Sequence, residues 1–490
     1  MTQNADGLFG NIDWQGKIFS GRWSNSSGGQ HKVIEPATGN ALATVGVANA
    51  EDVAKSAVSA KAAQTQWANR TPQERAAVLR RAAELFGRYQ SEIARWLIRE
   101  AGGTRAKSEF EILQTINFSM EAAAIASQPP GLVLPSAFPR ISLATRVPRG
   151  VIGVISPFNV PLLLSMRATA PALSLGNAVL LKPDLRTPVA GGLIIARVLE
   201  EAGLPEGLLH VLPGAGETGQ ALCQDPNIAM ISFTGSTETG RKVAELAGKH
   251  LKKVTLELGG KNSILILDDA DLDLAASNVA WGTWLHQGQI CMAAGRVIVH
   301  EKLATGLVQR LVEKANRLPV GNPDTEDVAL GPLIDKRQLE RVDAIVQESI
   351  HQGAELRAGG THKDLFYSPT VLEKVTPRMR AFREEIFGPV ACLTTFNSDE
   401  QAIALASDTE YGLSAGVISS SVERALALAR QIPVGMTHIN DQPVDDEAAV
   451  PFGGIGASGN GSRHGGPANW DEFTEWRWIT IQSKPHPYPF

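Results

Sequence analysis

The chain has 490 residues, 43% of them hydrophobic, and a formal net charge of -5 at pH 7. This length corresponds to roughly two to four domains with full apolar cores. The charges are interspersed and form no basic stripe, so we do not expect nucleic acid or an anionic membrane as a partner. The first residues, MTQNADGLFGNIDW, contain neither a basic region nor an apolar run, so we expect no signal peptide and a cytoplasmic protein.

A helix with a clear start is predicted after residue 70. Thr71, Pro72 and Glu74 have the pattern of a capping box with proline at the first helical position. The apolar side chains that follow fall on one face and predict a helix that faces a core: Leu79, Ala83, Phe86 and Ile93. This part of the chain is therefore interpreted as scaffold.

Short apolar runs alternate with helical stretches from residue 151 onward: VIGVIS (151–156), AVLLKP (178–183), LLHVLPG (208–214), MISFTGS (230–236) and VTLELGG (254–260). Strands that alternate with helices predict right-handed crossovers and a parallel sheet. This region is therefore expected to be a doubly wound α/β domain. The most apolar stretch, 161–181, contains Arg167, Pro171 and Asn177, which argues against a membrane span.

Ligands of such sheets bind beyond the carboxyl ends of the strands. Three useful side chains follow or end the predicted strands: Asn159, Lys182 and Glu257. An amide can donate to a developing oxyanion, a lysine can reach a ribose or phosphate, and a carboxylate can act as a base. Each also has an ordinary interpretation, as a turn residue, a solvated charge and a surface carboxylate. Their joint occurrence at successive strand ends favours a site.

The segment FTGSTETGRK (233–242) resembles a phosphate-binding loop. It is not a Walker A motif, because Lys242 is followed by valine and no hydroxyl stands in the required place, so NTP hydrolysis is not expected. A glycine-rich turn that enters a helix still presents backbone N–H groups to an anion, so a pyrophosphate could lie near Ser236. The simpler alternative, in which Ser236 only caps the helix, stays open.

The three cysteines differ in their surroundings. Cys223 and Cys392 lie in apolar segments and are interpreted as buried packing residues. They are far apart and form no C-x-x-C motif, so neither a disulfide nor a metal site is expected. Cys291 in HQGQICMAAGR is surrounded by small and polar residues instead. That setting makes it a candidate nucleophile, since small neighbours let other groups approach closely.

A second alternating region follows Cys291, with the segments SPTVL (368–372), EEIFGPVACL (384–393) and GLSAGVISS (412–420). It predicts another α/β unit. The tail, WDEFTEWRWITIQSKPHPYPF (470–490), combines three tryptophans with β-branched residues. We expect it to be an edge strand that pairs with another part of the chain or with another subunit.

Taken in order, several of these segments closely resemble the aldehyde dehydrogenase superfamily: SPFNVP, LLKPD, FTGSTETG, LELGGK, GQIC, EEIFGPV and PFGGIGASG. The resemblance extends from about residue 17 to about residue 483. It implies an α/β fold with a Rossmann-type dinucleotide-binding domain (1–125 and 149–257), an α/β catalytic domain (258–470) and a small bridging sheet (126–148 and 471–490). It also implies a homodimer or a homotetramer.

The resemblance makes Cys291 the nucleophile, Glu257 the general base and Asn159 an oxyanion donor. A thiolate would add to an aldehyde, the adduct would release a hydride, and the resulting thioester would be hydrolysed. The implied cofactor is NAD. Leu185 stands where many NAD-specific relatives carry glutamate, so NADP is expected to be accepted as well. The implied cofactor-binding residues are Ser156, Pro157, Phe158, Lys182, Gly216, Gly219, Phe233, Thr234, Gly235, Ser236, Leu258, Gly259, Glu385 and Phe387.

The segment INDQPVDDEAAVPFGGIGASG and the C-terminal FTEWRWITIQ resemble the branch of the family that oxidises aromatic aldehydes. The implied substrate-binding residues are Arg167, Val160, Leu163, Ile290, Met292 and Phe452. Arg167 could contact a ring hydroxyl or carboxylate, or it could point from its helix to solvent. An aliphatic or semialdehyde dehydrogenase, a cofactor-independent thiol hydrolase and a non-catalytic protein remain alternatives. The motifs for dinucleotide binding and the intact catalytic set argue against the last two.

Overall fold

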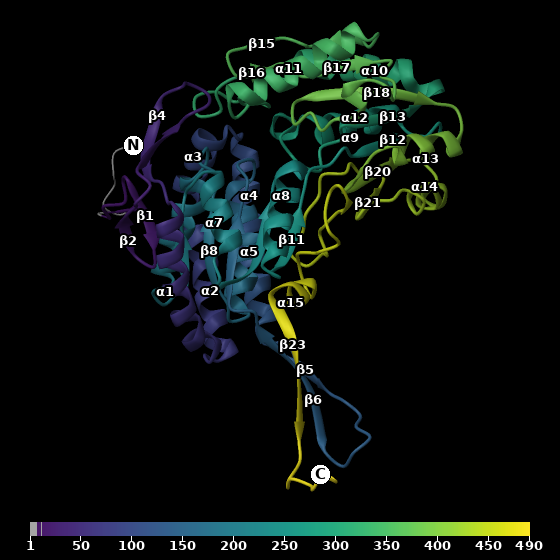
Figure 1. Ribbon diagram of the computed structural model, residues 1–490. Helices are drawn as coiled ribbons and strands as arrows, with labels where there is room; N and C mark the ends of the chain where they lie inside the picture. The colour runs from purple at the N-terminus through teal and green to yellow at the C-terminus, as the bar shows by residue number, and fades with distance from the viewer. Residues whose placement is uncertain (1–6, 11) are drawn as a thin grey trace.

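The computed structural model describes residues 7–10 and 12–490 (Figure 1). Its first sheet has seven strands in the order β11 (Lys253–Glu257), β10 (Ile228–Thr234), β7 (Val151–Ile155), β8 (Ala178–Lys182), β9 (Leu209–Val211), β1 (Lys17–Ser20) and β2 (Trp23–Asn25). The strands from β11 to β9 are parallel, and β1 is antiparallel to both of its neighbours. All five predicted strands are therefore present, and the parallel sheet is confirmed.

Helices cover this sheet: α1 (Ala50–Ala68), α2 (Pro72–Arg88), α3 (Gln90–Ala101), α4 (Arg105–Ile125), α5 (Pro161–Ser174), α6 (Ile194–Glu201), α7 (Gly216–Gln224) and α8 (Thr237–Lys249), with a π-helical turn at Val189–Leu193. The capping box of Thr71 and Glu74 starts α2 as predicted. The predicted single helix through Ile93 is wrong, because α2 ends at Arg88 and Ile93 lies on α3. Leu79, Phe86 and Ile93 are all buried nonetheless.

The second sheet also has seven strands: β14 (Glu355–Ala358), β17 (Thr370–Glu373), β18 (Val390–Phe396), β13 (Arg296–His300), β12 (Ser263–Ile266), β20 (Ser414–Ile418) and β21 (Met436–Ile439). All pairs are parallel except the edge strand β14. Its helices are α9 (Leu272–Trp284), α10 (Glu301–Arg317), α11 (Lys336–His351), α12 (Arg380–Arg383), α13 (Asp399–Ser407) and α14 (Val422–Ala429), with a 3-10 turn at Leu285–Gly288. The predicted second α/β unit is confirmed.

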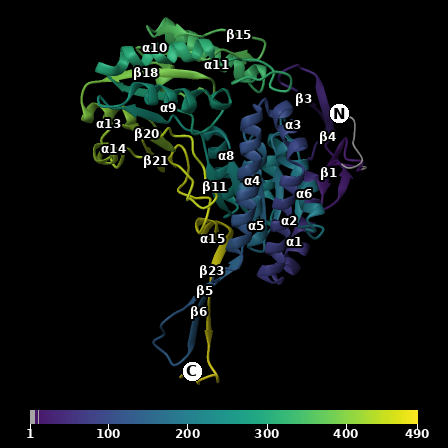
Figure 2. The same cartoon turned by 180° about the vertical axis from the view of Figure 1, so that it is seen from behind.

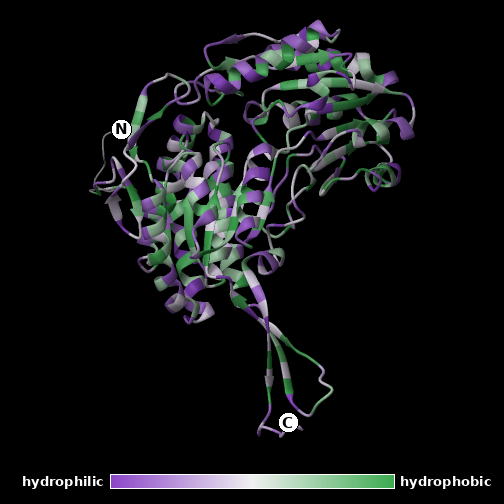
Figure 3. Cartoon of the chain, viewed as in Figure 1, coloured by the Kyte–Doolittle hydropathy of each residue, from purple (hydrophilic) through white to green (hydrophobic). Residues whose placement is uncertain are grey.

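Apolar residues are concentrated along the strands of both sheets (Figure 3). Strands β7, β8, β13 and β20 are buried along their whole length. Parallel strands covered by helices on both faces need such continuous apolar runs. Cys223 is buried in an apolar cluster around the first sheet and Cys392 in one beside the second sheet, which confirms their interpretation as packing residues.

The C-terminal strand β23 (Thr474–Ile481) pairs with β6 (Ile141–Pro148) of the same chain, and β6 pairs with β5 (Gly131–Val133). This three-stranded sheet projects from the two α/β units as an arm, joined to them by α15 (Ala468–Phe473) (Figures 1 and 2). The partner of the tail strand is thus found within the chain.

Short antiparallel strand pairs complete the fold: β3 (Gln30–Ile34) with β4 (Ala41–Gly46), β15 (His362–Lys363) with β16 (Phe366–Tyr367), and β19 (Tyr411–Gly412) with β22 (Ile455–Gly456).

Candidate active site

The carboxyl ends of β7, β8, β10 and β11 meet at one edge of the first sheet. Asn159 lies in the turn between β7 and α5, Lys182 ends β8 and Glu257 ends β11. All three side chains are buried, with 3%, 8% and 2% of their residue surface exposed. Burial removes the ordinary interpretations of Lys182 as a solvated charge and Glu257 as a surface carboxylate.

Cys291 lies in an irregular turn ahead of β13, and Asn262 fixes this turn. The Asn262 side-chain amide donates hydrogen bonds to the backbone carbonyls of Cys291 (2.8 Å) and Ala293 (3.0 Å), and its oxygen accepts one from the Ser414 N–H (3.0 Å). A Cβ atom on Gly260 would lie 2.7 Å from the Cys291 carbonyl oxygen, so glycine is needed for this approach. The turn is thereby attached to the second sheet.

Burial controls the protonation of the candidate nucleophile and base. It raises the pKa of the Cys291 thiol to about 12, against the opposing effect of the Arg167 guanidinium, and the carboxylates of Glu385, Glu257 and Asp446 raise it further. Burial also raises the pKa of Glu257 to about 8, which Arg167 again opposes. Within the described part of the chain, neither carboxylate oxygen of Glu257 has a hydrogen-bond partner. This carboxyl can therefore exchange a proton near neutral pH.

Asn159 is held firmly by its neighbours. Its side-chain amide donates to the Gln289 carbonyl at 2.8 Å, which leaves the second N–H of that amide for another acceptor. Its backbone carbonyl accepts a hydrogen bond from Lys107 at 2.9 Å. Lys107 forms a buried ion pair with Glu111, and Glu111 accepts from the backbone N–H of Leu162 at 2.8 Å. Sequence reasoning missed Lys107 and Glu111, which lie on α4 and carried no motif.

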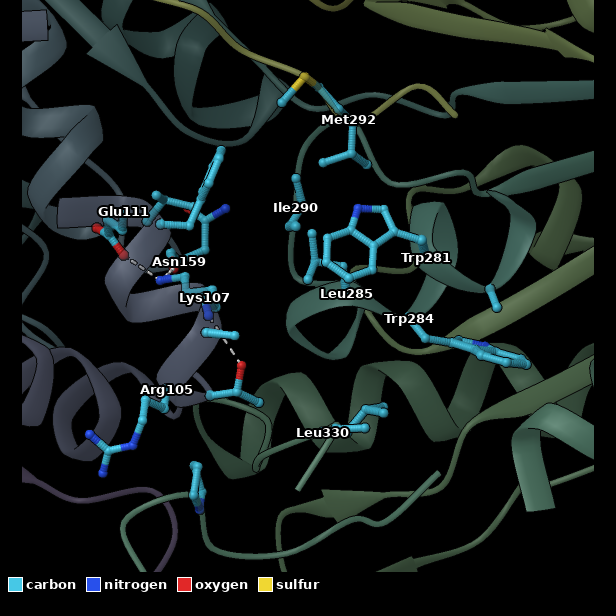
Figure 4. Close-up of a pocket in the computed structure, with 18 of the residues that line it drawn as sticks. Arg105, Lys107, Glu111, Asn159, Trp281, Trp284, Leu285, Ile290, Met292 and Leu330 are labelled. Carbon is cyan, nitrogen blue, oxygen red and sulfur yellow. Dashed lines mark hydrogen bonds and ion pairs between the residues drawn. The ribbon is translucent and has the colours of Figure 1, made fainter. Parts of the chain in front are cut away.

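A cavity of about 1300 Å³ opens beside Cys291. Figure 4 shows Asn159, Lys107 and Glu111 on one wall, facing Trp281, Leu285 and Ile290 on the other. All of the predicted substrate-binding residues line this cavity together with Asn159 and Cys291: Arg167, Val160, Leu163, Ile290, Met292 and Phe452. Glu257 does not line it. Sequence reasoning did not predict other lining residues, among them Trp281, Trp284, Leu285, Val444 and Asp446.

Arg167 does not point to solvent, so that alternative is wrong. It is 2% exposed, donates to Asp446 at 2.9 Å, and places its guanidinium carbon 4.2 Å from the centre of the Phe452 ring. Helix α5 is buried along its whole length, so no face of it was free to turn toward water. Arg167 instead faces the cavity beside Cys291.

The predicted cofactor residues lie along the strand ends of the first sheet and at its border with the second sheet. The Ser156 hydroxyl accepts a hydrogen bond from Ser165 (2.7 Å), and Pro157 and Phe158 follow it in the turn. Phe233 and Thr234 end β10 and Gly235 follows it, where a Cβ on Gly235 would lie 2.6 Å from the Phe233 ring. Leu258 packs against Gly240 of α8. Gly216 begins α7, and Gly219 follows one turn later.

Several of these residues have unused binding capacity for an anionic ligand. Within the described residues, the buried Lys182 ammonium makes a single long contact, with the Pro183 carbonyl at 3.5 Å, and burial lowers its pKa. Helix α7 has no side-chain cap, and a Cβ on Gly216 would meet nothing within 4 Å. Ser236 caps α8 and accepts from the Thr239 N–H at 3.4 Å. Two nearby helix N-termini and a buried lysine suit a pyrophosphate.

The border between the two sheets contributes Glu385 and Phe387. Glu385 accepts a hydrogen bond from the Gly260 N–H at 3.1 Å, and a Cβ on Gly259 would lie 2.5 Å from its carboxylate. Phe387 has a left-handed backbone (φ 56°), and its ring meets the Phe158 ring edge to face at 5.9 Å. Burial raises the pKa of Glu385 to about 7.

Arg186, which follows Leu185 in the chain, is already engaged by two carboxylates. It pairs with Asp184 at 2.8 Å and with Asp335 at 3.0 Å, and lies 3.9 Å over the Phe158 ring. The same pairing occupies Asp184. Leu185 lies between them and is partly buried.

Comparison with known proteins agrees with this geometry. The model of the aldehyde dehydrogenase family matches residues 23–479. A vanillin dehydrogenase of an Amycolatopsis species is 54% identical over 97% of this chain and 98% of its own, and a benzaldehyde dehydrogenase [NAD(+)] of Pseudomonas putida is 49% identical over the same shares. The crystal structure of betaine aldehyde dehydrogenase from Staphylococcus aureus in complex with NAD+ has a TM-score of 0.94 at 29% identity, covering 99% of this chain and 98% of its own.

The chain therefore belongs to the aldehyde dehydrogenase family, and the resemblance read from its motifs is confirmed. Among the residues that the structure describes, no helix is long and apolar enough to cross a membrane. Those residues also contain no group of three or more His, Cys, Asp or Glu side chains arranged to bind a metal ion.

Proposed function

We propose that this protein oxidises aromatic aldehydes of the benzaldehyde type to carboxylic acids, with NAD as the hydride acceptor. The observation that carries the proposal is the position of Cys291 and Asn159 on a single cavity that is largely apolar near the sulfur. Ile290, Met292 and Phe452 pack together there and present surface that suits a flat ring. The names of the relatives, vanillin and benzaldehyde dehydrogenases, support the same substrate class.

In this proposal the thiolate of Cys291 adds to the carbonyl carbon of the aldehyde. The oxygen of the resulting adduct becomes negatively charged. The free N–H of the Asn159 amide and the backbone N–H of Cys291 are the donors that stabilise it. Because Asn159 is fixed by Gln289 and Lys107, its amide needs little reorganisation to act.

NAD, when bound, accepts the hydride that the tetrahedral adduct releases. The product left on the protein is a thioester of Cys291. Glu257 takes a proton from a water molecule, whose oxygen attacks the thioester carbonyl and releases the carboxylic acid and the thiolate. A carboxyl with a pKa of about 8 suits this transfer, since it can take the proton of the water and release it to solvent close to the working pH.

Lys182, Ser236 and the N-terminus of α7 would hold the dinucleotide through its ribose and phosphates, and Glu385 and Phe387 would hold the nicotinamide ribose and ring. The unused hydrogen-bonding capacity of Lys182 and the open space at Gly216 fit such a group. Leu185 offers no carboxylate to repel a 2′-phosphate, so NADP should be accepted better than in a relative that carries glutamate there.

We further propose that residues 1–125 and 149–257 form the dinucleotide-binding domain, 258–470 the catalytic domain, and 126–148 with 471–490 a bridging sheet. The arm exposes Leu132, Val133, Trp476 and Trp478, and exposed apolar surface of this kind favours association with a second copy. A homodimer or homotetramer in the cytoplasm is the expected form. Light scattering of the arm variant Trp478→Ser would show a shift toward monomer.

The test of the proposed activity is a panel of aldehydes assayed with NAD and with NADP. The proposal expects reduction of NAD with benzaldehyde, a higher kcat/KM for aromatic than for short aliphatic aldehydes, and measurable reduction of NADP. A preference for aliphatic aldehydes would favour the dehydrogenase alternative within the family. Hydrolysis of thioesters without any NAD reduction would favour a thiol hydrolase.

A further inference from the structure

The cavity beside Cys291 contains two buried charged side chains that pair with each other. Arg167 comes from α5, and Asp446 comes from the irregular segment after β21. Arg167 Nη1 donates to Asp446 Oδ2 at 2.9 Å, and their side chains are 3% and 9% exposed. Both residues line the cavity, as does Phe452, whose ring lies under the guanidinium. We refer to these two side chains as the Arg167–Asp446 pair.

Each side chain of the Arg167–Asp446 pair has one buried polar atom without a hydrogen-bond partner in the described part of the chain. Arg167 Nη2 and Asp446 Oδ1 are both buried, and neither has a hydrogen-bond partner among residues 7–10 and 12–490. A buried charged group without all its hydrogen bonds is costly, so such atoms are expected to meet a ligand or water. The two atoms have opposite requirements, because a guanidinium nitrogen only donates and a carboxylate oxygen only accepts.

A hydroxyl group matches both requirements at once. Its oxygen can accept from Arg167 Nη2 while its hydrogen is donated to Asp446 Oδ1. A carboxylate could accept from Arg167 but would be repelled by Asp446, and an ammonium group would meet the reverse problem. An ether oxygen could accept but would leave Asp446 without a donor. The Arg167–Asp446 pair is also neutral as a whole, so it offers no net charge to an ionic substituent.

We propose that the Arg167–Asp446 pair binds a ring hydroxyl of the substrate, so that hydroxylated aromatic aldehydes are preferred over unsubstituted, methoxylated and carboxylated ones. This inference rests on the proposed oxidation of aromatic aldehydes at Cys291. It goes further in assigning a role to Asp446 and in separating a hydroxyl from a carboxylate as the group that Arg167 recognises.

The first test needs no variant. Wild-type kcat/KM is measured for benzaldehyde and for its ortho, meta and para hydroxy, methoxy and carboxy derivatives, at a pH where the phenol keeps its proton. The hydroxy compound should exceed the matched methoxy compound about tenfold at one ring position, the effect of one hydrogen bond to a charged group. Equal values for hydroxy and methoxy compounds at all three positions would overturn the inference.

The second test uses Asp446→Asn, with Glu447→Gln as the control, since Glu447 is exposed on the same segment. Asp446→Asn should reduce the hydroxy preference and raise the relative kcat/KM for carboxybenzaldehyde, because Arg167 loses its neutralising partner. Glu447→Gln should change neither ratio. An equal loss for all substrates, together with no hydroxyl preference in the wild type, would mean that the Arg167–Asp446 pair is only structural. Absence of benzaldehyde turnover in the wild type would instead contradict the proposed function.

Discussion

The side-chain amide of Asn262 donates a hydrogen bond to the backbone carbonyl of Cys291 at 2.8 Å. Asn262 immediately precedes β12, so this bond attaches the cysteine turn to the second sheet, while Asn159 attaches the first sheet to the Gln289 carbonyl two residues earlier. The reactive sulfur is thus fixed from both sheets. A catalytic group needs such support, since a small displacement of the reacting atoms lowers the reaction rate strongly.

Replacing Asn262 with alanine should therefore impair catalysis without removing any reacting group. We expect kcat/KM to fall by about tenfold or more, since roughly 1.4 kcal/mol of lost positioning corresponds to a factor of ten. Steady-state kinetics measure the fall in kcat/KM, and titration with NAD by fluorescence measures whether the dinucleotide still binds. Asn278→Ala is the matched control, because the Asn278 amide donates to the Leu274 carbonyl of its own helix, α9, on the side that faces solvent. Equal activity of both variants would show that the turn keeps its geometry without Asn262.

The pKa of Glu257, raised to about 8 by burial, predicts the pH profile. A base acts in its deprotonated form, so turnover should increase as pH rises through about 8 and level off above it. Glu257→Gln should lose this ascending limb and show a burst of NADH followed by slow turnover, because thioester hydrolysis needs the base. Stopped-flow absorbance over a pH series measures both effects. A variant that keeps the wild-type profile would assign the titration to another group.

The buried pair of Lys107 and Glu111 should matter for stability as well as for the position of Asn159. Lys107→Met would leave Glu111 buried without its cation, which costs about 3–5 kcal/mol in comparable pairs. Thermal unfolding should therefore show a clear loss of Tm. The control is Lys55→Met, which breaks the fully exposed i, i+4 pair with Glu51 and should leave Tm unchanged. A similar Tm for both variants would mean that Lys107 contributes little where it is buried.

Much of this site could be predicted from the sequence because strand periodicity and strand-end residues are local signals. The five parallel strands of the first sheet were found in that way, as were Asn159, Lys182 and Glu257. Asp446 was not, because it lies in an irregular segment without periodicity and its partner Arg167 is 279 positions away. The direction of the Arg167 side chain could not be predicted either, since α5 is apolar on all sides and has no distinct polar face. The break at Tyr89 was missed because both helices continue the same apolar spacing.

Leu185 should influence the choice between NAD and NADP. Introducing a carboxylate with Leu185→Glu should raise the ratio of kcat/KM for NAD over NADP by about tenfold, if ~1.4 kcal/mol of repulsion toward the 2′-phosphate is added. The engagement of Arg186 with Asp184 and Asp335 leaves Lys182 as the cation expected to meet that phosphate. Leu185→Gln controls for size without charge. An unchanged ratio in the glutamate variant would place the 2′-position away from Leu185.

In the proposed reaction Cys291 carries the acyl group during turnover. The most direct measurement is mass spectrometry of Glu257→Gln after rapid mixing with benzaldehyde and NAD and acid quenching, followed by peptide mapping. A benzoyl thioester should appear on the peptide that contains Cys291, and none should appear when NAD is omitted or when Cys291→Ala is introduced into the same variant. NADH formation without any acyl group on Cys291, or an acyl group on Cys223 or Cys392, would contradict the proposed reaction.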